Sequence, residues 1–165
     1  MSSVETVNTA TLVPQGTWTV DPVHSSIRFD VIDTETAFKS VSGRFTDFEG
    51  TVEPGETKGI VRTASVISDN DQRDEHLRSP DFFEVERFPE IRFESNRIEH
   101  VEGDRHKIFG ELTIKDVAVP VELDAKFLAA GLNPQDVEST VFRVTGEIEW
   151  GPTRVEITAD ITATK

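Results

Sequence analysis

The chain has 165 residues, with 31 acidic and 17 basic side chains and a formal net charge of −14. It contains eleven Phe, two Trp and no Cys. The length suits one domain with a sizeable core. Because nucleic acids and anionic membrane surfaces attract clustered Lys and Arg, the acidic balance argues against both as partners. The absence of cysteine excludes thiol catalysis, thiolate metal sites and disulfide bonds.

The first residues lack the basic and apolar regions that mark a signal peptide. No apolar run reaches the length of about 20 residues that a bilayer-spanning helix needs. We therefore expect a cytoplasmic protein. Residues 1–15 are predicted to form a flexible polar lead-in. Residues 16–165 are predicted to form one domain, because no repeat, linker or low-complexity tract divides them.

Apolar and polar residues alternate over several segments, as they do in half-buried antiparallel strands. In chain order these segments are 26–31, 91–95, 119–127, 142–150 and 155–161. A Gly-Pro pair at 151–152 separates the last two, which we expect to form a hairpin. Glycines are predicted to mark turns or sharp bends at Gly43, Gly50, Gly55, Gly59, Gly103, Gly110 and Gly131.

A polar segment at 69–80 interrupts the alternation. It opens with residues that cap helix N-termini and closes before a proline, so we expect one or two helical turns that cap one end of the sheet. Many alternating strands and one short helix leave a sandwich or an up-and-down barrel. Clean alternation and short turns favour an all-β antiparallel barrel of about eight strands. Such a barrel either fills itself with side chains or holds a small ligand.

Five segments carry a family resemblance, and they lie in order over about residues 17–127. They are WTVDPVHSS at 18–26, GRFTDFEG at 43–50, DEHLRSPDFF at 74–83, RFPEIRF at 87–93 and GELTIKDV at 110–117. Together they resemble the YceI-like family of lipid- and polyisoprenoid-binding proteins. The resemblance implies a lipocalin-like barrel whose apolar interior holds a long isoprenoid chain.

Two segments depart from the family pattern. Residues 32–40 are slightly longer than the usual connection and lack its His. Near the end, a bare hairpin over 140–162 replaces the Asn-Arg-x-Asp-Phe-Gly strand and the Gly-Asp-Glu-Val segment of the family. Both departures would alter a mouth or a wall of the cavity, so the resemblance carries over the fold but not the identity of the ligand.

Large apolar residues occupy the inward phase of the predicted strands. By periodicity alone they form either a packed core or a ligand tunnel, and the resemblance favours the tunnel. Arg44 is the predicted polar anchor if its side chain turns inward, although strict alternation points it outward. His24 is predicted either to bond locally at a turn or to contact a ligand head group. The predicted lining is Ile27, Phe29, Val31, Phe45, Phe93, Leu112, Ile114, Leu123, Phe127, Val144 and Trp150.

The remaining polar motifs predict no metal and no catalytic group. The acidic run at 69–74 lacks the oxygen ligand and the glycine that an EF-hand has at its fifth and sixth positions. The histidines show no HxH or HExxH spacing. His100 and His106 flank a polar turn and are predicted to be solvated, and His76 is predicted to join the helix to the barrel. No GxSxG, phosphate loop or GxGxxG motif is present.

Three hypotheses about function follow. The first is a non-enzymatic protein that stores, carries or sequesters a polyisoprenoid, an isoprenoid quinone or a similar lipid, without another cofactor. The second is a cyclase or isomerase whose cavity holds an apolar polyketide- or isoprenoid-like substrate in a reactive conformation. The third is a filled barrel that acts as an interaction module. The resemblance also allows a homodimer through an outer barrel wall.

Overall fold

The computed structural model describes residues 16–33, 39–53, 55–150 and 153–165. The predicted lead-in at 1–15 lies outside the described residues. The elements are β1 (Trp18–Val20), β2 (Ser26–Asp33), β3 (Lys39–Phe45), β4 (Phe48–Glu53), β5 (Glu56–Arg62), the 3₁₀ turn η1 (Thr63–Ser65), β6 (Val66–Ile67), α2 (Asp71–Arg78), β7 (Glu90–Glu102), β8 (Arg105–Ile114), β9 (Val117–Leu132), β10 (Glu138–Trp150) and β11 (Thr153–Thr164).

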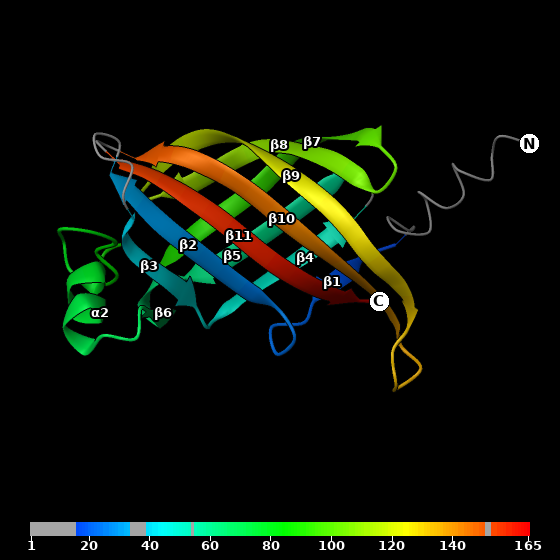
Figure 1. Ribbon diagram of the computed structural model, residues 1–165, viewed down its shortest axis with the longest axis horizontal. Helices are drawn as coiled ribbons and strands as arrows, with labels where there is room; N and C mark the ends of the chain where they lie inside the picture. The colour runs from blue at the N-terminus through cyan, green and yellow to red at the C-terminus, as the bar shows by residue number, and fades with distance from the viewer. Residues whose placement is uncertain (1–15, 34–38, 54, 151–152) are drawn as a thin grey trace, which may run out of the picture.

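The strands close into an antiparallel barrel (Figure 1). Eight described strands form a ring in the order β1-β4-β5-β7-β8-β9-β10-β11, and pairing of β1 with β11 closes it. The long strand β11 pairs with β2 over residues 153–160 and with β1 over residues 163–164. Strands β2, β3 and β6 therefore complete the wall near α2, and β1 completes it at the opposite end. The predicted all-β barrel of about eight strands is confirmed.

The five predicted strand segments lie within β2, β7, β9, β10 and β11, and the last two pair as a hairpin with Glu149 opposite Arg154. The prediction for the glycines is wrong at Gly43, Gly50, Gly59, Gly110 and Gly131, which lie inside strands. At Gly110, a Cβ atom would overlap the backbone of the neighbouring strand β7. Glycine is present there because the two backbones approach too closely for a side chain.

Helix α2 confirms the predicted cap, and Figure 1 shows it at one end of the barrel. The side chain of Asn70 caps its N-terminus by accepting a hydrogen bond from the Arg73 backbone N–H at 3.0 Å. The buried Asp74 carboxylate accepts a hydrogen bond from the Ser68 backbone N–H at 2.6 Å. Leu77 is fully buried in the core at this end of the barrel. These two side chains dock the helix.

The core consists of two clusters at opposite ends of the barrel. The cluster at the α2 end contains Phe29, Phe45 and Phe83. The other, which we call the far-end cluster, contains Trp18, Val52, Ile108, Ala125, Phe127, Phe142, Val144, Ala159, Ile161 and Ala163. Three partly buried residues pack against both clusters and so lie between them. They are Ile27, Phe93 and Leu123.

Candidate functional site

A cavity of about 200 Å³ occupies the barrel interior between the two clusters. Its walls come from strands on every side of the barrel, because inward-facing residues of each strand reach it. Nine of the predicted lining residues are at this wall. They are Ile27, Phe29, Val31, Phe45, Phe93, Leu112, Ile114, Leu123 and Val144.

A belt of apolar side chains lines this space. These side chains belong to the inward phase of their strands, yet they are only half-buried. Since they point inward, the surface that they leave exposed faces the cavity. The middle of the barrel is therefore less well packed than its ends. The belt consists of Ile27, Val61, Phe93, Leu112, Leu123 and Ile157.

Two cavity residues come from the loop between α2 and β7, which strand periodicity did not predict. The ring of Phe83 is buried and lies 5.9 Å from the ring of Phe29 and 5.6 Å from that of Phe45. Phe82 is half-buried, lines the cavity and packs on Phe83 at 5.1 Å. The motif that carries the family resemblance contains both residues, and this was the available signal. This loop closes the α2 end of the barrel.

Polar contacts hold this loop against the barrel. The Lys115 ammonium donates a hydrogen bond to the Pro80 carbonyl at 3.3 Å and lies 3.6 Å from a carboxylate oxygen of Glu84. At the end of α2, the Arg78 guanidinium donates to the carbonyls of Ala64 and Val66 at 3.0 and 2.9 Å. The loop is thus fastened at its edges, and the Phe82 side chain that it carries is half-buried.

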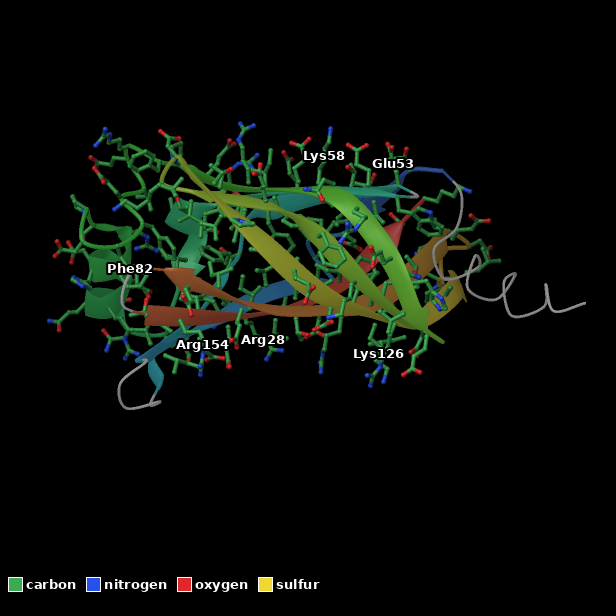
Figure 2. The ribbon with its side chains drawn as sticks, turned by 90° about the horizontal axis from the view of Figure 1, so that it is seen from above. Arg28, Glu53, Lys58, Phe82, Lys126 and Arg154 are labelled. Carbon is green, nitrogen blue, oxygen red and sulfur yellow. The ribbon has the colours of Figure 1, made fainter. Side chains whose placement is uncertain are left out.

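The charged residues beside the cavity turn their charges outward. Lys58 pairs with Glu56 at 3.0 Å, and Arg28 pairs with Asp160 at 3.1 Å. Figure 2 shows the side chains of Arg28 and Lys58 directed away from the barrel. Thr57 supplies the one hydroxyl side chain among the described lining residues. The interior surface is therefore almost wholly apolar and suits a molecule held by shape and burial.

The two predicted polar contacts lie outside the cavity. Arg44 is in the outward phase of β3, and its guanidinium pairs with the Asp69 carboxylate at 3.2 Å. His24 is 71% exposed in the turn between β1 and β2, and its Nδ1 lies 2.7 Å from an Asp21 carboxylate oxygen. The hydrogen bond with His24 lowers the pKa of Asp21. Neither side chain therefore reaches a ligand in the barrel interior.

Two predicted lining residues also lie away from the cavity wall. Phe127 is buried in the far-end cluster, with its ring 5.1 Å from that of Phe142. Phe142 lines the cavity, whereas Phe127 does not. The side chain of Trp150 lies outside the described part of the molecule.

The histidine predictions need two corrections. His106 is only 6% exposed, because β8 turns it inward and its ring packs on those of Phe127 and His100 at 5.2 and 5.0 Å. Burial, assisted by the nearby His100, lowers the pKa of His106. His100 is exposed, as predicted, with Nε2 2.9 Å from the Gly103 carbonyl oxygen. His76 is exposed on α2, whereas Leu77 on the same helix is buried.

Within the described ranges, no group of three or more His, Asp or Glu side chains is placed to hold a metal ion. None of the helical segments in those ranges has the length and apolar character needed to cross a membrane.

Residues 18–163 match the family model of the YceI-like domain. The chain belongs to the YceI-like family. Protein YceI of Salmonella arizonae is 35% identical over 112 residues, which are 68% of this chain and 58% of that protein. UPF0312 protein plu2095 of Photorhabdus laumondii is 32% identical with the same coverage. This chain thus matches only 58% of the length of these curated relatives.

Solved structures of other proteins share the barrel. Burkholderia cenocepacia BcnA matches with a TM-score of 0.74 at 18% identity, over 88% of this chain and 99% of BcnA. A polyisoprenoid binding domain from Saccharophagus degradans matches with a TM-score of 0.68 at 14% identity, over 89% of this chain and 97% of that domain. At these identities the likeness establishes the fold.

Proposed function

We propose that this YceI-like protein binds a long apolar molecule in the barrel interior, for storage, transport or sequestration. A polyisoprenoid or an isoprenoid quinone has the required chemistry. The observation that carries the proposal is the apolar cavity between two packed clusters. An apolar chain that enters it gains about 0.8 kcal/mol for each CH₂ group removed from water.

The family supports the same ligand class. The chain is a YceI-like domain, and its structural neighbour from Saccharophagus degradans is described as a polyisoprenoid binding domain. The wall of this cavity adds a further argument, because the charged side chains beside it turn outward. A ligand with a polar head group would therefore bury its chain and leave the head group at a mouth of the barrel.

The α2 end is the proposed mouth. The cavity volume of about 200 Å³ is below the range of roughly 300–1,000 Å³ that is usual for drug-sized ligands. A long chain therefore needs extra room, and the half-buried Phe82 is the lining residue best placed to provide it by changing rotamer. Its neighbour Phe83 is buried and packs on the rings of Phe29 and Phe45.

The other two hypotheses have less support. A filled barrel would have no contiguous cavity, and this barrel has one. A templated cyclase or isomerase would use the same cavity, but no described feature of the wall favours chemistry over binding. We therefore retain binding as the proposed function.

Mass spectrometry provides the test. The protein is purified without detergent, extracted with organic solvent and examined for lipids, and the extracted protein is then offered isoprenoid quinones of increasing chain length. We expect a co-purifying apolar lipid or stoichiometric uptake of a quinone. Absence of both, from protein that is folded by circular dichroism, would overturn the proposal.

A further inference from the structure

We propose that Gly59 sets the width of the cavity and thereby selects which apolar chains can occupy it. This inference rests on the proposed binding function and assigns a specificity-determining role within the same site. Gly59 lies in β5, in the inward phase that it shares with Val61 and Thr57. It lines the cavity and is the pairing partner of Phe93 in β7 and of Gly50 in β4.

The space beside Gly59 is open. A Cβ atom built on this residue would have one neighbouring atom within 4 Å, the Glu49 carbonyl oxygen at 3.7 Å, which is an ordinary van der Waals distance. The backbone of Gly59 does not have the positive φ that disfavours other residues. Neither sterics nor backbone conformation therefore requires glycine here. What the missing side chain provides is room in the cavity.

Other inward glycines have a different role. A Cβ atom at Gly43 would lie 2.7 Å from the Phe29 ring, and one at Gly50 would lie 2.9 Å from the Lys58 carbonyl oxygen. At Gly110 it would overlap the backbone of β7, and at Gly146 it would overlap the side chain of Leu123. At these positions, other atoms of the protein occupy the space that a side chain would need. Among these inward positions, Gly59 alone leaves its space to the cavity.

The position of this space indicates what it selects. Gly59 faces the belt of half-buried side chains, of which Phe93 is its direct neighbour across the strand pair. A larger residue at position 59 would project into the cavity beside this belt. It would weaken the binding of a chain that carries methyl branches or a ring beside position 59 more than the binding of a straight chain. The glycine therefore favours a broad apolar chain over a narrow one.

The test uses Gly59→Ala, Gly59→Val and Gly59→Leu with two probes. Farnesol is a methyl-branched isoprenoid alcohol, and the second probe is the straight-chain alcohol with the same number of main-chain carbons. In Gly59→Leu we expect the Kd for farnesol to rise about tenfold, as when roughly two methylene groups lose their burial. The affinity for the straight-chain alcohol should fall less. The affinities of Gly59→Val for both probes should lie between those of the wild type and Gly59→Leu.

Thermal unfolding separates this effect from damage to the fold. Because glycine weakens a strand interior and the added side chain fills apolar space, the Tm of Gly59→Val and Gly59→Leu should equal or exceed that of the wild type. Ala118→Leu is the matched control, since it adds apolar bulk at an exposed strand position that does not line the cavity. Its affinity for both probes should be unchanged.

The outcomes are distinguishable. If the wild type binds neither these alcohols nor any isoprenoid quinone, the proposed function fails, and the inference fails with it. If the wild type binds farnesol and all three Gly59 variants bind it equally well, the inference alone is overturned. An equal loss of affinity for the branched and straight probes would also overturn it, because Gly59 would then not select by width.

Discussion

The two ends of this barrel are closed by different kinds of structure. At the α2 end, Phe82 and Phe83 reach the interior from a loop, which Lys115 and Arg78 fasten at its edges. At the other end, Phe142 comes from a strand and packs against other strand residues. A side chain carried by a paired strand moves with the sheet, whereas one carried by a loop can move alone. We therefore regard the loop as the entrance and the far-end cluster as the floor.

The largest effect is expected from breaking the floor. Phe142→Ala removes a ring that is 4% exposed and belongs to the far-end cluster. We expect it to lower the free energy of unfolding by about 3–5 kcal/mol, as for other buried Phe→Ala substitutions. Denaturant unfolding measures the change. A loss similar to that of Phe82→Ala would remove the distinction between the two ends.

A smaller loss is expected when the helix at the entrance is undocked. Asp74→Asn keeps an acceptor oxygen for the hydrogen bonds that Ser68 donates but removes its charge, so the expected loss is only a part of the about 1.5–3 kcal/mol that a charge-assisted bond is worth. The bond with the Ser68 hydroxyl is the main cause that lowers the pKa of Asp74 below its ordinary 3.8. The stabilisation is therefore present above pH 3.8 and is lost as the pH falls through the lower pKa of the folded state.

Denaturant unfolding of the wild type and Asp74→Asn at several pH values tests this expectation. The difference in unfolding free energy should be full at neutral pH and shrink below pH 3.8. Asp71→Asn is the control, because Asp71 is on the same helix but is exposed. A difference that stays constant down to the acid transition would contradict the assigned role of Asp74.

Truncation of Phe82 at the entrance should change the rate of ligand release more than the stability of the fold. Phe82 is half-buried, so Phe82→Ala should cost less than about 2 kcal/mol, below the range for fully buried Phe. We expect release of a bound isoprenoid quinone to become faster, because less apolar surface covers the mouth. Stopped-flow displacement measures this rate. Equal release rates for the wild type and Phe82→Ala would place the entrance elsewhere.

The smallest effect concerns a pH dependence at the floor. Burial and the neighbouring His100 lower the pKa of His106 below its ordinary 6.5, whereas Asp104 acts in the opposite direction. Below pH 6.5 the unfolded state therefore binds a proton before the folded state does, and stability falls with falling pH. This group can contribute at most about 1.4 kcal/mol per pH unit. In His106→Phe that part of the slope should vanish, whereas His100→Phe should retain most of it, because burial is the larger cause of the lowered pKa.

Much of this architecture was predictable because strands repeat every two residues. The alternation over 26–31, 119–127 and 155–161 predicted both the strands and their inward faces, and it placed Ile27, Phe29 and Leu123 at the cavity wall. Periodicity could not assign Phe82, because a loop has no repeat to show which side chains turn inward. It also could not show that the cavity is open, which depends on how side chains pack across the barrel.

The remaining errors have local causes. Gly59 has no side chain and so adds nothing to an apolar pattern, although its strand position makes it part of the wall. His106 was predicted to be solvated because it follows a polar turn. The strand β8 already begins at Arg105, immediately before it. Arg44 follows the alternation of β3 outward, which is where its partner Asp69 lies.

A crystal structure of the protein purified without detergent and loaded with an isoprenoid quinone tests the central claim most directly. We expect continuous elongated density that passes Gly59 and Phe93, ends above Phe142 and reaches the mouth beside Phe82. A barrel whose middle is filled by side chains, with the quinone on an outer wall or absent, would contradict the account.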